Sequence, residues 1–590
     1  MKEPLQSQII TGYDLYNAFK NGAKQLSVYE EEINRINVFP VQDADTGTNL
    51  YQTSKAILEY SDWTVDLYKT VRSISQVAIS EAKGSSGSIV ALYLRGFQKY
   101  IPSFDGVTLK SFAQLLGSAY LYVHQSMSQP REGTILTIMR VWAEYFEKIE
   151  NQNISIKNAL GNSILILRDA LENTKNQLDV LSRINVVDAG ALGMVCFLEG
   201  CLKSFRRGRI KHYSPSKEML AEEELVPSPP LFRYCYEVNL EGNELKNEEI
   251  KDILECYGDS LVCIPSDSCL HIHIHTDSPS EVSRYLSTIG QISKVKVDDL
   301  NQQYLLTQKK SGGIALVVDS SCDMNLTDIS SHVYKIPMPM VVDNNQHLDG
   351  VTMDGRHLYE DMGLKEVSCR SSQISQGVFE GVYLKLLKRY DHVISIHISK
   401  NFSGTYDNAI RAAKEVNGKE HPKIDVWDSG TLSSAYGMMV DTIAKSIENE
   451  STLMSLREEF EVVKRKTEIW VSVRSLNAMI NSGRVPQSFQ KVAKLFSVYP
   501  LISMNKEGKA MIGGVAFSFD HSLRRLVSKL KKRSIKRCQV VHVGANYDSH
   551  RLEEMVQQKT EYELLPSVSV TPVIGIYAGL GAVGIVVEYE

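Results

Sequence analysis

Residues 37–49 read NVFPVQDADTGTN, a polar segment that stands directly before a helical pattern. Two carboxylates, Asp43 and Asp45, are separated by one residue, and hydroxyl, glycine and amide residues follow them. Mg²⁺ prefers one or two carboxylates together with water and phosphate oxygens, and N–H groups at a helix start bind phosphate. The same residue types are common in turns and helix caps, so residue type alone favours a capped turn over a magnesium site.

The chain around this segment divides into three predicted domains. Residues 1–212 carry apolar side chains at three- and four-residue spacing, which is typical of helices. A polar, acidic, proline-bearing linker covers 213–230, and residues 231–307 alternate short β patterns with a helical stretch. From 314 to 590, β-rich runs alternate with helical patterns, which indicates an α/β domain.

Composition narrows the class of protein. Among 590 residues, 65 Lys and Arg face 70 Asp and Glu, and this mildly acidic balance argues against nucleic acid as a partner. Nine cysteines without a CxxC pair, and a start without a secretory signal, predict a cytoplasmic protein without a disulfide framework. The uncharged run Leu564–Val587 is long enough to span a bilayer, but its prolines and glycines favour a strand, a glycine-rich loop and a strand.

Four ordered segments resemble the DhaL-type kinase domains of dihydroxyacetone kinases and bacterial fatty acid kinases (FakA). They are 37–49, AKGSSGSIVALYLRGF (82–97), PREGTILTIMR (130–140) and VVDAGALG (186–193). The resemblance covers nearly all of residues 10–205 and implies an antiparallel helical barrel that binds ATP through magnesium. It implies that Asp43 and Asp45 are the catalytic magnesium ligands. The other nucleotide-site residues that it implies are Thr46, Thr48, Asn49, Ser85, Ser86, Gly87, Thr134 and Asp188.

Two positions depart from this family pattern. Ala44 stands where the family usually has glycine, and Ser85 stands where it usually has asparagine. An alanine is strained only if its backbone φ is positive, and a serine keeps a hydroxyl but lacks the reach of the amide. The departures leave open whether the nucleotide site works at reduced activity.

The segment HIHIHT (271–276) predicts a strand with three histidines on one side. Neighbouring positions on that face lie about 6–7 Å apart, so two imidazoles can share a metal, and Cys235 could add a thiolate for Zn²⁺. A polar strand face without metal is the alternative. Residues 231–304 also resemble the middle domain of FakA, whose zinc ligands correspond here to Cys235, His273 and His275; His271 is then an additional histidine.

Residues 314–590 resemble the DegV family, which includes FakB and whose members bind a fatty acid and present its carboxylate to the kinase. The matching segments are VVDSSCDM (317–324), SSQIS (371–375), SKNFSGTY (399–406), VWDSG (426–430) and SGRV (482–485). Small hydroxyls at loop ends suit a buried carboxylate, although each serine alone is more typical of a turn. The residues placed near the head group by the resemblance are Ser371, Ser372, Ser403, Thr405 and Arg484, of which Arg484 is also a catalytic candidate.

The segment GLGAVG (579–584) fits the dinucleotide pattern GxGxxG, but the six residues after it leave no room for a Rossmann unit. It aligns with the DegV element that usually reads His-Thr-Gly-Pro-Gly. Tyr577 takes the place of the histidine as a substrate-side residue, and Leu580 that of the proline. The basic run 524–537 predicts a solvated helix face rather than a docking surface for an acidic kinase or anionic lipid.

This domain order predicts a fatty acid kinase-like protein that uses ATP and Mg²⁺ to convert a bound fatty acid into acyl phosphate, with Zn²⁺ as a further candidate cofactor. A fatty carboxylate is already ionised at pH 7, so the obstacle is charge repulsion between two anions. We expect a long-chain fatty acid as ligand, a homodimer, and transient contact with a membrane or an acyltransferase.

Two other functions stay open at this point. One is a non-catalytic fatty-acid carrier or sensor with a degraded nucleotide site, which the departures at Ala44, Ser85 and Tyr577 suggest. The other is a dihydroxyacetone-type small-molecule kinase, although no module that would hold a triose through a histidine is visible in the sequence.

Overall fold

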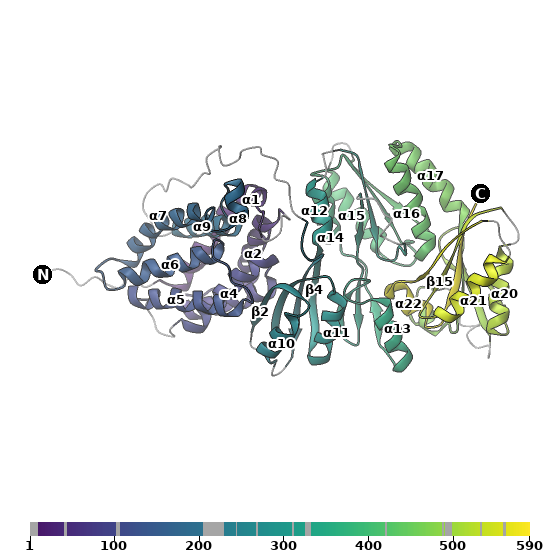
Figure 1. Cartoon of the computed structure of the whole chain (residues 1–590), viewed down its shortest axis with the longest axis horizontal. Helices are drawn as coiled ribbons and strands as arrows, with labels where there is room; N and C mark the ends of the chain where they lie inside the picture. The colour runs from purple at the N-terminus through teal and green to yellow at the C-terminus, as the bar shows by residue number, and fades with distance from the viewer. Residues whose placement is uncertain are drawn as a thin grey trace. The chain divides into compact units, whose positions relative to one another are not determined.

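The computed structural model describes most of the chain and divides it into two compact units (Figure 1). The described residues are 10–39, 44–101, 107–203, 229–242, 245–266, 269–308, 312–324, 332–418, 422–485, 489, 498–530, 534–558 and 562–590. The N-terminal unit comprises Met1–Val282 and Thr288–Gln308, and the C-terminal unit comprises Ser283–Ser287 and Lys309–Glu590.

The described part of residues 12–202 is entirely helical, as the apolar periodicity predicts. The helices are α1 Gly12–Arg35, α2 Thr46–Tyr60, α3 Leu67–Glu81, α4 Gly84–Tyr100, α5 Leu109–Ser126, α6 Ile135–Ile149, α7 Ile156–Thr174, α8 Asp179–Ile184 and α9 Ala189–Leu202. Helix α9 is apolar on nearly all sides and is almost wholly buried. Its Gly200 lets α1 approach closely, because a Cβ there would lie 2.5 Å from the carbonyl oxygen of Asn21. The expectation of an all-α first domain is confirmed.

A four-stranded antiparallel sheet with the order β2-β3-β1-β4 follows and packs on these helices. Its elements are β1 Tyr234–Glu241, α10 Asn247–Leu254, β2 Gly258–Pro265, β3 Cys269–Thr276, α11 Pro279–Ile289, β4 Gln291–Asp299 and α12 Leu300–Gln308. Val262 and Ile264 of β2 belong to the same hydrophobic core as the helices. The backbone N–H of Ser128 donates to the carbonyl of Leu261 at 3.4 Å, so the sheet and the helices share one packed interface.

The C-terminal unit begins with a parallel sheet, β11-β10-β5-β6, which is the α/β arrangement that the alternating pattern predicts. Its strands are β5 Ile314–Asp319, β6 Val333–Ile336, β10 His392–His397 and β11 Ile424–Asp428. The helices associated with them in the chain are α13 Gly355–Leu364, α14 Gln376–Leu386, α15 Thr405–Asn417, α16 Ser433–Glu448 and α17 Leu453–Lys466. A small antiparallel sheet of β7 Pro339–Val342, β8 Asn345–Leu348 and β9 Cys369–Ser371 lies between β6 and α14 in the sequence.

A second sheet with the order β14-β13-β12-β17-β15-β16 completes this unit. Its strands are β12 Thr467–Ser472, β13 Tyr499–Met504, β14 Ala510–Ala516, β15 Ile535–His542, β16 Glu563–Ser569 and β17 Val583–Tyr589. The helices that accompany them are α18 Asn477–Asn481, α20 Phe519–Lys529, α21 Asn546–Gln557 and α22 Pro572–Ala578. The multidomain fold class, with a middle α+β part and a C-terminal α/β part, is confirmed.

The uncharged run near the C-terminus contains a helix that its glycines and prolines do not predict. It forms β16, the short helix α22 and β17, rather than strand, loop and strand. Thr571 is extended and Pro572 occupies the first turn of α22, where a missing N–H has no cost. Within the described residues, none of the helices combines the length and the hydrophobicity that crossing a bilayer requires.

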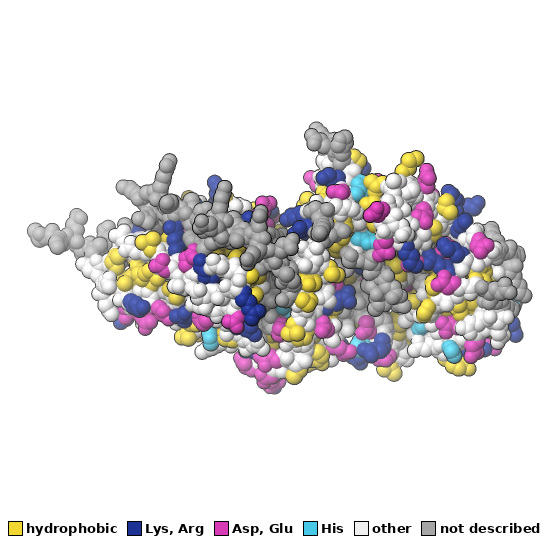
Figure 2. Space-filling model, turned by 45° about the horizontal axis from the view of Figure 1, so that its top comes forward, with side chains coloured by type: hydrophobic (Ala, Val, Ile, Leu, Met, Phe, Trp, Pro, Cys, Tyr) yellow, Lys and Arg dark blue, Asp and Glu magenta, His cyan; other side chains and the backbone are white. Residues whose placement is uncertain are grey.

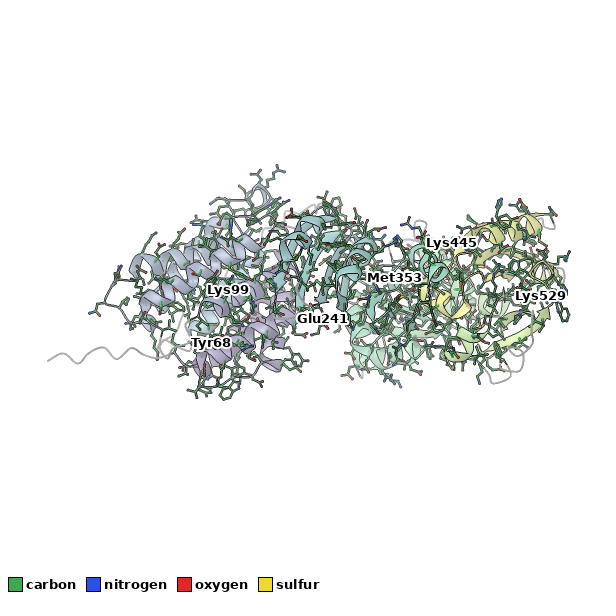
Figure 3. All side chains as sticks on the ribbon, turned by 90° about the horizontal axis from the view of Figure 1, so that it is seen from below. Tyr68, Lys99, Glu241, Met353, Lys445 and Lys529 are labelled. Carbon is green, nitrogen blue, oxygen red and sulfur yellow. The ribbon has the colours of Figure 1, made fainter. Side chains whose placement is uncertain are left out.

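The basic run 524–537 is not a single solvated helix face, which corrects the sequence-based expectation. Residues 524–529 lie on α20, 531–533 fall outside the described residues, and 535–537 lie on β15. The ammonium of Lys529, labelled in Figure 3, lies 3.7 Å from the centre of the Trp470 ring. Arg537 is 7% exposed and forms ion pairs with Asp441 and Glu588. Acidic and basic side chains are interspersed on the face of the molecule shown in Figure 2.

A buried Ser–His–Asp arrangement lies on the parallel sheet. His397 Nδ1 is 3.1 Å from Asp319 Oδ2, and His397 Nε2 is 2.7 Å from Ser395 Oγ. All three side chains are fully buried, and Ser395 Oγ also accepts a hydrogen bond from the hydroxyl of Tyr383. Since substrate has no access to this serine, the arrangement links β5, β10 and α14 rather than forming a hydrolase site.

Candidate functional site

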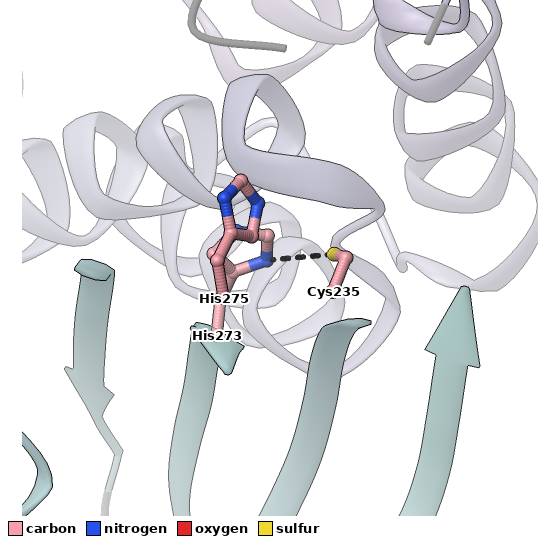
Figure 4. Close-up of side chains that lie close together, drawn as sticks. All are labelled: Cys235, His273 and His275. Atoms are coloured by element: carbon pink, nitrogen blue, oxygen red, sulfur yellow. Dashed lines mark hydrogen bonds between the residues drawn. The ribbon is translucent and has the colours of Figure 1, made fainter. Parts of the chain in front are cut away.

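The strand register of the middle sheet brings one cysteine and two histidines together. Cys235 on β1 is paired directly with His275 on β3, and His273 lies two residues away on the same face. The candidate ligand atoms of the three side chains all lie within 4.8 Å of one another. Figure 4 shows them at the end of the sheet that faces the helices, with Cys235 Sγ 3.8 Å from His273 Nδ1.

The environment of this Cys/His cluster keeps its ligands uncharged. Burial raises the pKa of the Cys235 thiol well above its usual value and lowers the pKa of His275 to about 3. The Nε2 atom of His273 is buried and has no hydrogen-bond partner among the described residues. Three converging N and S donors, one of them unsatisfied, fit a Zn²⁺ ion with an open fourth position. His271 lies outside the cluster, and its Nδ1 is 2.8 Å from Asn239 Oδ1.

The same cluster lines a cavity with residues that the sequence assigns to the nucleotide site. The cavity has an empty volume of about 400 Å³, part of it open to solvent. Its lining residues are Asn37, Asp45, Thr46, Asn49, Gly84, Ser85, Cys235, His273, His275, Asp298 and Leu300. Two chemical patterns that are separate in the sequence, at residues 43–49 and 271–276, are therefore joined by the tertiary structure in one nucleotide-side cavity.

Within this cavity, Asn49 fixes the orientation of Asp45. The amide of Asn49 donates to Asp45 Oδ1 at 2.8 Å, and Asp45 is the residue before α2. A Cβ on Gly84 would lie 2.2 Å from the Asn49 amide nitrogen, so only glycine lets α4 begin this close to α2. Asp43, the second predicted magnesium ligand, lies outside the described residues.

Thr48 points away from this cavity toward α1. Its hydroxyl donates to Glu30 Oε1 at 2.7 Å, and Asn34 Nδ2 donates to the same hydroxyl at 2.9 Å. Asn34 Oδ1 also accepts from the N–H of Gly47 at 2.7 Å. Thr48 therefore joins α2 to α1 and does not line the cavity.

Four further predicted nucleotide residues lie on neighbouring helix starts and do not line this cavity. Thr134 caps α6 by accepting from the N–H of Leu136 at 3.3 Å, and Asp188 caps α9 by accepting from the N–H of Ala191 at 2.7 Å. Burial raises the pKa of Asp188 to about 7, against hydrogen bonds from three backbone N–H groups. Ser86 and Gly87 lie in the first turn of α4.

Ala44 adopts the left-handed backbone conformation, with a φ of 55°. We expect Ala44→Gly to stabilise the N-terminal unit by about 0.5–1 kcal/mol, because the alanine Cβ is strained at positive φ. The measurement is thermal unfolding with hydrogen exchange of peptides from α2. Ala82→Gly is the matched control: Ala82 has a φ of −51°, so this change should destabilise the unit. Stabilisation by both changes, or by neither, would contradict the explanation by strain.

The C-terminal unit contains a second, larger cavity on one face of the six-stranded sheet. Its empty volume is about 1040 Å³, part of it open to solvent, and its walls are mostly apolar side chains. The apolar side chains of the sheet that line it include Ile469, Val471, Ile502, Val541 and Val543. Four predicted head-group residues line it as well: Ser371, Ser403, Arg484 and Tyr577.

The polar residues of this cavity contact one another. The Tyr577 hydroxyl is 2.8 Å from Ser371 Oγ, and the Arg484 guanidinium lies 4.5 Å from the centre of the Tyr577 ring. Arg484 Nε donates to the carbonyl of Phe402 at 2.8 Å. An apolar cavity with hydroxyls and a guanidinium at one place suits an amphiphilic anion.

Two predicted head-group residues do not line the cavity. Ser372 is exposed, and its N–H donates to the carbonyl of Pro339 at 2.8 Å. Thr405 is fully buried at the start of α15, where its hydroxyl is 2.9 Å from Ser403 Oγ. Thr405 is therefore placed to orient Ser403 rather than to contact a ligand.

Two buried carboxyls that the sequence analysis did not single out hold the start of α22, the helix that carries Tyr577. Asp323 accepts from the N–H of Thr571, and Asp349 accepts from the N–H of Val573, both at 2.9 Å. Burial raises the pKa of Asp323 to about 6 and that of Asp349 to about 7. Asp323 lies in the quoted segment VVDSSCDM, but only the tertiary structure shows which backbone groups it binds.

The raised pKa of Asp349 predicts a pH effect on stability. The folded state retains a proton that the unfolded state loses near pH 4, so stability falls as the pH rises from about 4 toward 7, by up to about 4 kcal/mol. Asp349→Asn keeps an acceptor for Val573 and should lose less stability between pH 5 and 8 than the wild type. Urea unfolding of the C-terminal unit at both pH values measures this. Asp407→Asn, at an exposed position on α15, is the control, and parallel profiles for Asp349→Asn and wild type would refute the assignment.

Three family models match consecutive parts of the chain. Residues 40–203 match the DAK2 domain, residues 231–305 match the FakA-like middle domain of fatty acid kinase, and residues 313–590 match "Uncharacterised protein, DegV family". The chain therefore combines a DAK2 (DhaL-like) domain, a FakA-like middle domain and a DegV domain. This is the fusion that the sequence motifs predict.

Curated relatives resemble about half of the chain. An uncharacterized protein of Staphylococcus saprophyticus is 29% identical over 320 residues, which is 51% of this chain and 57% of the relative. An uncharacterized protein of Staphylococcus aureus strain USA300 is 28% identical over 298 residues, or 48% of this chain and 54% of the relative. The chain thus spans about half the length of these relatives.

Solved structures of DegV family proteins also resemble part of the chain. One is described as fatty acid binding of a DegV family protein from Thermus thermophilus, with 24% identity, a TM-score of 0.44, and coverage of 47% of this chain and 100% of that chain. Another is DegV, a fatty acid binding protein from Bacillus subtilis, with 24% identity, a TM-score of 0.43, and coverage of 47% and 99%.

Proposed function

We propose that this chain is a fatty acid kinase that phosphorylates the carboxylate of a fatty acid held in its DegV domain. The observation that carries the proposal is the large apolar cavity with Ser371, Arg484 and Tyr577 at one place, in a chain that also has a DAK2 domain. A mostly apolar cavity of this size suits a long acyl chain, and its polar groups suit a carboxylate. The match of residues 231–305 to a fatty acid kinase domain supports the same substrate class.

The proposed reaction needs no general base. One oxygen of the ionised carboxylate forms a bond to the γ-phosphorus of ATP, and the bond from that phosphorus to the β–γ bridging oxygen breaks, which gives acyl phosphate and ADP. Ser371 and Ser403 bind the carboxylate, and Arg484 offsets its charge. Tyr577 holds Ser371 through its hydroxyl and Arg484 through its ring face.

The nucleotide-side cavity requires cations before it can accept phosphate. Asp45 and Asp298 line it, and Glu237 and Asp259 lie 3.5 Å and 3.6 Å from imidazoles of the Cys/His cluster. Lys296 is the basic side chain paired with Glu237 and Asp298 there. Because acids outnumber bases, phosphate is repelled unless divalent cations are present. We propose Mg²⁺ on Asp45 and Asp43 and Zn²⁺ on Cys235, His273 and His275, both of which would supply positive charge.

The test uses the purified full-length chain. Co-purified lipid is identified by mass spectrometry, and acyl phosphate formed with MgATP is trapped as the hydroxamate while ADP is measured. The proposal predicts a bound long-chain fatty acid and equal amounts of hydroxamate and ADP. Bound fatty acid without ATP turnover would refute the kinase, and turnover of dihydroxyacetone without turnover of fatty acid would establish a small-molecule kinase instead.

A second function, that of a fatty-acid carrier or sensor without phosphoryl transfer, is favoured by one observation. Ala44 is held at positive φ beside the predicted magnesium loop, where the family resemblance places glycine. In that case the DegV cavity is functional and the nucleotide-side cavity does not turn over ATP. For either function we propose a cytoplasmic homodimer that contacts a membrane or an acyltransferase transiently when it delivers its product.

A further inference from the structure

We infer that Glu237 is a positioning residue that couples the Cys/His cluster of the middle domain to the start of α4 in the nucleotide site. It lies two residues after Cys235 on β1, so both side chains project from the same face of the sheet. The inference rests on the nucleotide-binding part of the proposed function and does not depend on the identity of the phosphate acceptor.

Glu237 contacts both partners of this coupling. Its Oε1 accepts the hydrogen bond from the backbone N–H of Gly84, the first residue of α4, and lies 3.5 Å from His273 Nδ1. The carboxylate is 3% exposed, so these contacts are made away from bulk water. One buried side chain therefore touches a candidate zinc ligand and the helix that begins with Gly84, Ser85 and Ser86.

Helix α4 depends on this contact because its own cap is missing. Lys83 stands at the N-cap and forms no side-chain hydrogen bond to the helix. The first N–H groups of a helix need partners from outside it, and a carboxylate at this end also interacts favourably with the helix dipole. Glu237 supplies that partner from a strand 153 positions away in the sequence.

The start of α4 in turn contacts the magnesium side of the cavity. Gly84 lies so close to Asn49 that a Cβ would clash with its amide, and that amide orients Asp45. A shift of α4 would therefore disturb Asn49 and Asp45 together. This continuous path, Cys/His cluster to Glu237 to Gly84 to Asn49 to Asp45, predicts that zinc and nucleotide affect each other's affinity.

The experiment measures that coupling in the full-length chain. Zn²⁺ affinity is determined by competition with a chromophoric chelator, with and without saturating MgADP, and MgADP affinity is determined with and without Zn²⁺. In the wild type we expect each ligand to change the affinity of the other by about fivefold or more, equally in both directions. In Glu237→Ala the coupling should fall to near onefold, and MgADP should bind about tenfold more weakly even when zinc is present.

Two further variants keep the test decisive. Glu237→Gln retains an acceptor for Gly84 but removes the charge beside His273, so it should keep most of the MgADP affinity and lose most of the coupling. It serves in place of Glu237→Ala if that variant does not fold. Glu241→Gln is the matched control, because Glu241, labelled in Figure 3, is exposed at the opposite end of β1. It should leave both affinities and their coupling unchanged.

The outcomes separate this inference from the proposed function. A wild-type chain that binds neither MgADP nor Zn²⁺ would refute the nucleotide site itself. A wild-type chain that binds both independently, or Glu237 variants that keep the full coupling, would overturn the role of Glu237 while leaving the kinase proposal intact.

Discussion

Asp45→Asn is expected to lower ATP-dependent acyl phosphate formation by at least about 100-fold. The change removes one negative charge from the predicted magnesium ligands, and phosphoryl transfer between two anions depends on charge neutralisation by the metal. The asparagine keeps an oxygen that can accept from Asn49, so the start of α2 should stay folded. The hydroxamate assay at saturating MgATP measures the rate.

The controls separate loss of catalysis from loss of structure. Asp169→Asn replaces an exposed carboxylate on α7 in the same domain and should leave the rate within about twofold, as surface changes usually have small effects. The fatty acid content of Asp45→Asn should equal that of the wild type, because the lipid cavity belongs to the other unit. A rate for Asp45→Asn close to the wild-type rate would show that Asp45 does not hold the catalytic metal.

Arg537→Met is expected to destabilise the C-terminal unit by about 3–5 kcal/mol, because removing one partner leaves buried charge uncompensated. Arg537 forms ion pairs with Glu588 and Asp441, and its Nη2 donates to the carbonyl of Met438 at 2.8 Å. The Glu588 side chain is only 2% exposed. Urea unfolding, followed by hydrogen exchange in peptides from β15, β17 and α16, measures the loss.

Lys536→Met is the matched control for this prediction. Lys536 pairs with the same Glu588 at 2.9 Å, but its side chain is 55% exposed. Exposed ion pairs contribute about 0–1 kcal/mol, so this variant should remain close to the wild type. Equal effects of the two substitutions would mean that burial does not set the strength of the Arg537 interactions.

Much of the architecture is predictable from sequence because it is encoded locally. Apolar spacing determines helical faces, as in α5 and α7, and alternation determines strand faces, as in HIHIHT. The family motifs also lie in order along the chain, so their identification requires no tertiary information. For these reasons the helical, mixed and α/β parts, and the three matching families, agree with the sequence-based prediction.

The predictions that failed concern contacts between distant segments. Thr48 has the right residue type for a phosphate site, yet Glu30 and Asn34 of α1 bind its hydroxyl. Arg537 belongs to a run that is basic in sequence, yet its partners come from α16 and β17. In each case the deciding partner lies far away in the chain, and residue type does not reveal it.

The sequence by itself determined the order of three domains, the chemical character of their motifs and the side of each strand on which a residue lies. Only the tertiary structure decided that the Cys/His cluster and Asp45 line one cavity, and that Glu237 caps α4 across the domain boundary. The physical reason is that periodicity depends on local backbone geometry, whereas a shared cavity depends on how separate elements pack. Packing follows from the summed burial of many apolar side chains, as where Val262 and Ile264 join the helical core.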